Sequence, residues 1–179
     1  AVREAAHPTP DAAGEAAARE IMEVAASARE GDLVLALISG GGSALMTLPR
    51  EPLTLEEKIA VNKLLLKSGL AIDDMNRVRR RLSRVKGGGL ARAAAPARLV
   101  TLAISDVPGD DPAVIASGPT VADPTTLADA RAVLEKYGIE PPGPVTGHLN
   151  GDAETPKPGD ERLAGAEYVL VATPAQSLA

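Results

Sequence analysis

The chain has 179 residues, of which 45% are hydrophobic, and its formal net charge at pH 7 is −5. This length is about that of one domain, and the hydrophobic content excludes a disordered chain. The negative net charge disfavours nucleic-acid binding, and so does a composition with no Phe, no Trp and only two Tyr. The absence of cysteine excludes disulfides, thiolate metal sites and cysteine nucleophiles.

Membrane and export signals are also missing from the sequence. The longest apolar runs are too short to span a bilayer, and the N-terminal stretch AVREAAHPTPD holds no apolar signal segment. We therefore expect a cytoplasmic protein that binds no membrane. The chain begins at Ala1 and ends without a tail, so we expect a fragment of a longer protein.

The first elements predicted are a helix and a strand. Asp11 is placed to cap a helix that stops near Gly31. Residues 33–38 form an apolar run between glycines, which is typical of a strand buried on both faces of a parallel sheet.

The next part of the chain predicts two helices and a short helical piece. Thr54 and Glu57 form a capping-box pattern, and that helix stops at residues 68–69. A second helix is expected from residue 73 or 74 to Lys86, because apolar residues recur there at helical spacing. An alanine-rich helical piece then ends at Pro96.

The second half predicts two further strands, at residues 99–104 and 168–172, and a helix from 127 to 138. Residues 141–165 are rich in proline, glycine and charge, which indicates an extended surface connection. Apolar strands that alternate with helices predict an α/β fold with a mainly parallel sheet. Ligands bind beyond the carboxyl ends of such strands, so the loops after residues 38, 104 and 171 are candidate sites.

The first of these loops, SGGGSA, supplies candidates for phosphate or substrate binding. Its glycines let backbone amides approach an anion, and a following helix would add its positive end. A tight strand-to-helix turn capped by Ser43 explains the pattern equally well. The lysine of the Walker A motif is absent. The dinucleotide-binding fingerprint also fails, because Leu45 occupies the position that needs a small residue. The candidate residues are Ser39, Gly40, Gly41, Gly42 and Ser43.

The stretch NRVRRRLSRVKGGG carries six basic residues from Arg77 to Lys86. A solvated basic helix face, with a lysine at the helix C-terminus, accounts for most of them. Arg79 and Lys86 are seven residues apart and would share one face of the predicted helix. A lysine beside flexible glycines is a candidate phosphate clamp. We therefore expect binding roles for Lys86, Arg79, Gly87 and Gly88, and a catalytic role for Lys86.

The acidic loop SDVPGDDP follows the second predicted strand. Asp106 has no capping role there, and its carboxylate can hold magnesium through water or orient a hydroxyl group. Asp110 is ambiguous, and Asp111 can cap a short helix. We expect Asp106 to be catalytic, and Asp106 with Asp110 to bind the metal.

The two histidines, His7 and His148, lie next to proline or glycine and lack the spacing of metal ligands. A surface or hydrogen-bonded role is predicted for both.

Taken together, several motifs resemble the glycerate 2-kinases of the two-domain, MOFRL-containing type. The matching stretches are HPTPDAAG, LISGGGSAL, NRVRRRLSRVKGGGLARAAAPA, SDVPGDDPAVIASGPTVADPTT and TPKPGD, in an order and spacing that agree over nearly the whole chain. The resemblance implies a Rossmann-like, three-layer α/β/α N-terminal kinase domain, of which residues 1–179 are part. It also implies a separate C-terminal domain that this chain lacks, so the chain alone is incomplete for catalysis.

The resemblance further implies an ATP- and magnesium-dependent transfer of phosphate to the 2-hydroxyl of D-glycerate, giving 2-phosphoglycerate. The family's three motifs fall on the loops described above, with Asn76 and Ser83 also matching. Where the family commonly has Gly-Ser-Asn after the last strand, this chain has Ala172-Thr173-Pro174. Members are often labelled hydroxypyruvate reductases, so an NAD(P)H-dependent reductase stays an alternative. A ligand-binding module without turnover, an oligomer scaffold and a homodimer also stay open.

Overall fold

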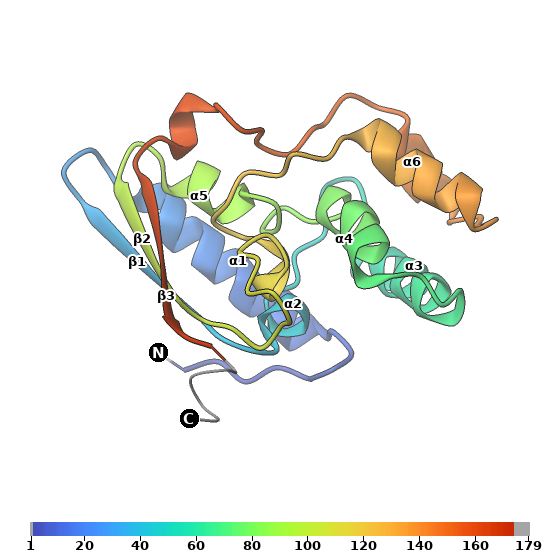
Figure 1. Cartoon of the computed structure of the whole chain (residues 1–179), viewed down its shortest axis with the longest axis horizontal. Helices are drawn as coiled ribbons and strands as arrows, with labels where there is room; N and C mark the ends of the chain where they lie inside the picture. The colour runs from blue at the N-terminus through green and yellow to red at the C-terminus, as the bar shows by residue number, and fades with distance from the viewer. Residues whose placement is uncertain (1, 174–179) are drawn as a thin grey trace.

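The computed structural model describes residues 2–173, and its centre is a sheet of three parallel strands in the order β1-β2-β3 (Figure 1). The strands are β1 (Leu33–Ile38), β2 (Arg98–Ile104) and β3 (Ala166–Ala172). The three strands predicted from apolar runs and the parallel α/β class are confirmed. All three strands end at the same edge of the sheet, which places their following loops together.

Helices cover one face of this sheet. The helices α1 (Ala12–Ser27) and α5 (Gly89–Ala94) lie against it (Figure 1). Small side chains allow this close packing: Ala18 and Ala94 are fully buried in the cluster that joins the helices to β1.

The other face of the sheet is exposed within residues 2–173. The side chains of Leu33, Leu35 and Leu37 are 60%, 53% and 70% exposed. The expectation that β1 is buried on both faces is therefore wrong for the described chain, because no described helix covers the face to which these alternate residues point. The second helix layer of a three-layer arrangement is likewise not formed by these residues.

Four helices form a second unit beside the sheet (Figure 1). They are α3 (Leu55–Lys67), α4 (Ile72–Arg81), α6 (Leu127–Lys136) and α7 (Gly143–Leu149). They share one hydrophobic core, in which Val61, Leu65 and Val78 are fully buried. The prediction of an extended connection over residues 141–165 is wrong for α7, because Val145 and Leu149 are anchored in this core.

Local capping signals locate the helix starts. The Asp11 side chain accepts a hydrogen bond from the Gly14 amide, and Thr54 with Glu57 forms the predicted capping box. Short helical turns complete the described chain: α2 (Gly42–Leu45), η1 (Ile115–Ser117) and η2 (Glu161–Leu163). None of the helices in residues 2–173 has the length and apolar character needed to cross a membrane.

The helix α4 ends at Arg81, so its predicted extension to Lys86 is wrong. Beyond it the chain pairs with an earlier segment: Ser83 forms an antiparallel bridge with Pro49, and the Arg84 amide donates to the carbonyl of Leu48 at 3.0 Å. These tertiary contacts replace the helical hydrogen bonds. Lys86 therefore lies in a turn between α4 and α5.

Candidate anion-binding site

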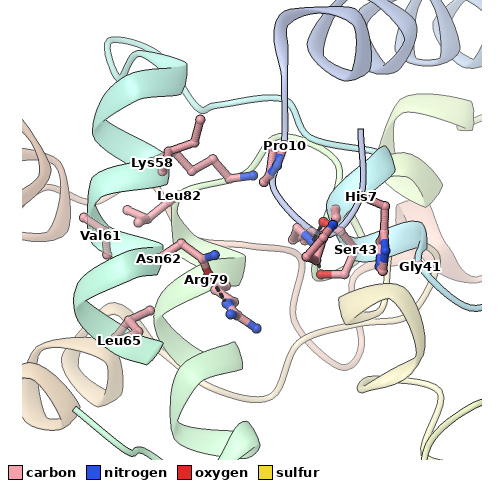
Figure 2. Close-up of a pocket in the computed structure, with 14 residues that line it drawn as sticks. His7, Pro10, Gly41, Ser43, Lys58, Val61, Asn62, Leu65, Arg79 and Leu82 are labelled. Carbon is pink, nitrogen blue, oxygen red and sulfur yellow. Dashed lines mark hydrogen bonds between the residues drawn. The ribbon is translucent and has the colours of Figure 1, made fainter. Parts of the chain in front are cut away.

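A cavity of about 270 Å³ lies between the two units of the fold. Its walls come from parts of the N-terminal segment before α1 and of the glycine loop, and from the facing sides of α3 and α4 (Figure 2). The polar side chains that line it are those of His7, Ser43, Lys58, Asn62, Arg79 and Lys86.

The cavity joins the two predicted glycine-rich regions. Gly41 and Ser43 line it from the first, and Lys86 comes from the second. The Lys86 ammonium donates to the Ser43 carbonyl at 2.6 Å and to the Ser43 hydroxyl. The argument that Arg79 and Lys86 share a helix face is wrong, because α4 ends between them, yet both line this cavity.

Three cations meet at this cavity with neutral partners. The Lys58 ammonium donates to the Thr47 hydroxyl at 2.6 Å, and Arg79 Nε donates to the Asn62 side-chain oxygen at 2.7 Å. Lys58 and Lys86 are 8% and 3% exposed. In the part of the chain that the structure describes, none of the three forms an ion pair with a carboxylate. Their charge is thus available to a bound anion.

Burial and mutual repulsion lower the pKa values of these groups. Burial is the main reason that the pKa of Lys86 lies well below its usual value, and the charges of Lys58, Arg79 and Arg80 add to it. Burial and the charge of Arg79 lower the pKa of Lys58 to about 8, with Glu15 opposing them. Burial also lowers the pKa of Arg79. An anion in the cavity would offset both effects and raise all three pKa values.

The glycines of the first loop are explained by close packing as well as by ligand binding. A Cβ on Gly40 would lie 2.7 Å from Asp106 Oδ2, and one on Gly42 would lie 3.0 Å from the Cβ of Ala116. Gly41 has a φ of +79° and is the N-cap of α2, so the alternative in which Ser43 caps this helix is wrong in that detail. Because α2 is a single turn, the expected helix dipole contributes little.

Several predicted residues lie outside the cavity lining. Three of them, Ser39, Gly40 and Gly42, are close in sequence to the lining residues Gly41 and Ser43. The other two, Gly87 and Gly88, have φ values of +56° and +82° and pack against the segment 121–123. The role of these two glycines in the described structure is to let the chain turn after Lys86.

The acidic candidates lie beside the first glycine loop. Asp106 is exposed and packs at Gly40. Asp110 has a φ of +52°, and its buried Oδ1 has no hydrogen-bond partner among the residues that the structure describes. Across residues 2–173, no group of three or more His, Cys, Asp or Glu side chains is arranged to hold a metal ion. The metal-binding role of the two aspartates stays a prediction.

A strained turn lies next to both glycine-rich regions, and sequence reasoning did not single it out. Ala116 and Ser117 have φ values of +50° and +64°, which residues with a Cβ adopt rarely. The Gly87 amide donates to the Ser117 carbonyl at 3.1 Å, and the Ser117 and Ser43 hydroxyl oxygens are 3.0 Å apart. This turn therefore contacts both glycine-rich regions.

Two of the arginines that were assigned to a solvated basic helix face are buried instead. Arg80 and Arg81 form ion pairs with Asp123 at 3.0 and 3.1 Å, and Asp123 is 1% exposed. Burial alone would raise the pKa of Asp123, but hydrogen bonds from Thr125 and the two arginine charges hold it below its usual value. The solvated reading is wrong here because Asp123, distant in sequence, supplies the countercharge.

Sequence reasoning also missed Lys58 and Asn62 and assigned no ligand role to His7. A lysine on an amphipathic helix such as α3 is normally solvated, so its pattern carries no sign of burial. His7 is exposed, as predicted, but lies over Gly41 at the cavity mouth (Figure 2). His148 has the predicted hydrogen-bonded role, with Nε2 2.9 Å from the Arg81 carbonyl oxygen.

Known proteins are similar to this chain in sequence and fold. A family model described as "Domain of unknown function (DUF4147)" matches residues 1–150. The chain is 55% identical over 177 residues to a putative hydroxypyruvate reductase of Agrobacterium vitis, covering 99% of this chain and 40% of that protein. It is 51% identical over 138 residues to a glycerate 2-kinase of Pyrococcus horikoshii, covering 77% of this chain and 31% of that protein.

Two solved structures share the fold. The crystal structure of a glycerate kinase from Thermotoga maritima superposes with a TM-score of 0.87 at 45% identity, over 94% of this chain and 39% of that one. A Pyrococcus horikoshii protein superposes with a TM-score of 0.91 at 43% identity, over 98% of this chain and 41% of that one. The chain thus spans about two fifths or less of the length of these relatives.

Proposed function

The chain belongs to the DUF4147 family, and from that premise we propose that the protein containing it transfers phosphate from ATP to the 2-hydroxyl of D-glycerate, giving 2-phosphoglycerate. The relatives named as glycerate 2-kinase and glycerate kinase support this activity. It belongs to the longer protein, because the chain spans only part of each relative.

The observation that carries the proposal is the cavity with three cations that have no carboxylate partner among residues 2–173. D-Glycerate has one carboxylate, and both ATP and the product carry phosphate, so substrate and product match the charge of Lys58, Arg79 and Lys86. A cavity of about 270 Å³ is near the lower end of ligand pockets, which start at about 300 Å³. It therefore suits a three-carbon acid or a phosphoryl group better than a whole nucleotide.

The site can bind and position these anions without covalent chemistry. Phosphoryl transfer depends mainly on alignment and on stabilisation of charge on the phosphate oxygens. Lys86 uses two of its three N–H donors on Ser43 and keeps one for a ligand, and Lys58 uses one on Thr47. The role proposed for both lysines is to hold the anionic groups of substrate and transition state.

Magnesium, when bound, would neutralise charge on phosphate oxygens and hold them in line. Asp106 suits this ion because its carboxylate is exposed at the edge where β2 ends, next to the glycine loop. With Asp110 it would supply part of the ligand set, and water and phosphate oxygens would complete it. Asp106 can alternatively orient the glycerate hydroxyl. ATP as phosphate donor, a cytoplasmic location and a homodimer are part of the same proposal.

The experiment uses the full-length protein. D-Glycerate, ATP and magnesium are supplied and the phosphorylated product is identified, while a parallel sample receives hydroxypyruvate and NADH. Formation of 2-phosphoglycerate without NADH oxidation is the expected result. NADH oxidation without phosphorylation would overturn the proposal in favour of a reductase, and ligand binding without either reaction would leave a binding module.

A further inference from the structure

A chain of hydrogen bonds leads away from Lys86 into the protein. The ammonium donates to the Ser43 hydroxyl, whose oxygen is 3.0 Å from that of Ser117. The Ser117 hydroxyl in turn faces the side-chain oxygen of Asn76 at 3.4 Å. We call these four side chains the Lys86 relay.

Chemistry gives the relay one direction. An ammonium only donates, so the Ser43 oxygen accepts from Lys86. The Ser117 hydroxyl donates its hydrogen to the Asn76 carbonyl oxygen, which only accepts, so the hydrogen between the two serines comes from Ser43. Each hydroxyl is thereby oriented with its lone pairs toward the ammonium, and successive bonds of this kind polarise one another.

The relay ends on a neutral group, and its inner end is buried. Ser117 is 1% exposed and Asn76 2% exposed. A carboxylate in the place of Asn76 would hold the ammonium more strongly but would cancel its charge. A neutral relay keeps the proton on Lys86 and leaves the positive charge for the cavity.

The charged groups that face Lys86 make such support necessary. Lys58 approaches from α3, and Arg79 and Arg80 approach from α4, all of them cationic. His7 lines the same cavity from the N-terminal segment. In the described part of the chain no carboxylate pairs with Lys86, so the two oxygens of Ser43 are what holds its ammonium.

Backbone strain places Ser117 where the relay needs it. Ala116 and Ser117 are both left-handed, a conformation that costs energy for residues with a Cβ and that clusters at functional sites. The Ser117 carbonyl also accepts from the Gly87 amide, next to Lys86. The turn therefore holds both the side chain that supports Lys86 and the backbone that carries it.

We propose that Ser117, together with Asn76, is a positioning residue that orients the Ser43 hydroxyl and so keeps Lys86 protonated and aimed at the anion in the cavity. The kinetic consequence rests on the proposed kinase function, whereas the effect on Lys86 does not.

The first test measures the titration of Lys86 without any substrate. Full-length wild type, Ser117→Ala and Ser117→Gly are labelled with acetic anhydride over a range of pH, and the Lys86 peptide is quantified by mass spectrometry. We expect the titration midpoint of Lys86 to fall by about half to one pH unit in both variants, since each loses the same hydrogen-bonded hydroxyl. The midpoint of Lys63, exposed on α3, serves as the internal control.

A second variant distinguishes the effect of the Ser117 hydroxyl from the effect of the strained backbone. Ala116→Gly relieves a left-handed residue but keeps the Ser117 hydroxyl, so it should raise the thermal midpoint of unfolding and leave the Lys86 titration as in wild type. An unchanged Lys86 titration in both Ser117 variants, or an equal shift in Ala116→Gly, would overturn the relay. If Ser117→Ala does not fold, Ser117→Gly still decides, because glycine accepts the left-handed backbone.

The kinetic test follows the pH profile of kcat/KM for D-glycerate. The basic limb should move to lower pH in Ser117→Ala by the same amount as the Lys86 midpoint, while Ser27→Ala, an exposed serine at the end of α1, should match wild type. A purely structural role would lower activity without moving the limb, and that outcome overturns the proposal. Absence of phosphorylation in wild type would instead refute the kinase function, with the labelling result still standing.

Discussion

The same run of basic residues supplies two clusters whose environments are opposite. Arg80 and Arg81 are paired with the buried carboxylate of Asp123. Arg79 and Lys86, from the same run, are bonded to neutral groups within residues 2–173 and line the cavity. A cation paired with a buried carboxylate contributes to structure, whereas a buried cation with neutral partners is costly and is available to a ligand. The comparison therefore separates the paired arginines from the residues that we propose to bind the anion, within one short stretch.

The largest expected effect comes from breaking the paired cluster. Asp123→Asn removes the countercharge of Arg80 and leaves Arg81 with the partly exposed Glu154, so the free energy of unfolding should fall by about 3–5 kcal/mol. Urea denaturation of the full-length protein measures it. Asp152→Asn, at an exposed position, is the control and should stay within about 0.5 kcal/mol of wild type. A loss of less than about 1 kcal/mol would show that the pairs are not structural.

Breaking the unpaired cluster at Lys86 should be seen in activity. Lys86→Ala in the full-length protein should lower turnover roughly a hundredfold or more, equivalent to about 3 kcal/mol of lost transition-state stabilisation. Steady-state kinetics with D-glycerate and ATP measures it, with Lys63→Ala on the exposed side of α3 as the matched lysine control. A change of only a few-fold would remove Lys86 from the site.

Lys58 should show the cost of an unpaired charge directly. Its pKa is lowered to about 8, below its usual 10.5, so its charge destabilises the fold fully below pH 8, and stability regains that loss as pH rises from about 8 to about 10.5. Lys58→Met should therefore raise the free energy of unfolding at pH 7 by about 1–2 kcal/mol, with a gain that shrinks above pH 8.

Urea denaturation of Lys58→Met at several pH values, beside Lys63→Met, checks this. Inorganic phosphate should also bind more weakly to Lys58→Met than to Lys63→Met, as measured by calorimetry. A Lys58→Met variant that is less stable than wild type at pH 7 would contradict this prediction. It would mean that the hydrogen bond to Thr47 stabilises the fold more than the buried charge destabilises it.

The smallest effect is expected at Arg84, which belongs to neither cluster. Its ion pair with Glu51 spans 3.6 Å, and the two side chains are 41% and 86% exposed. Arg84→Gln should change the free energy of unfolding by less than about 0.5 kcal/mol. The activation free energy of turnover should change by no more than the same amount. A larger loss of turnover would place Arg84 with the cavity residues and weaken the distinction between the clusters.

Much of the fold was predictable because its signals are local. The capping residues Asp11 and Thr54 act within three residues of themselves, and the apolar runs of β1 and β2 report strands directly. The resemblance to glycerate 2-kinases rests on several motifs in order, and the relatives confirm it. Gly41, Ser43, Arg79 and Lys86 were candidates from sequence, and all four line the cavity.

What sequence alone determined, then, is the set of strands, most helix starts, the family and the chemical types available at the loops. Tertiary structure decided where α4 ends, that residues 143–149 form a helix, and which basic residues are paired. It also brought Lys58 and Ser117 to Lys86. The physical reason is that caps and strand patterns depend on near neighbours, whereas burial and countercharge depend on segments that meet only in the folded chain.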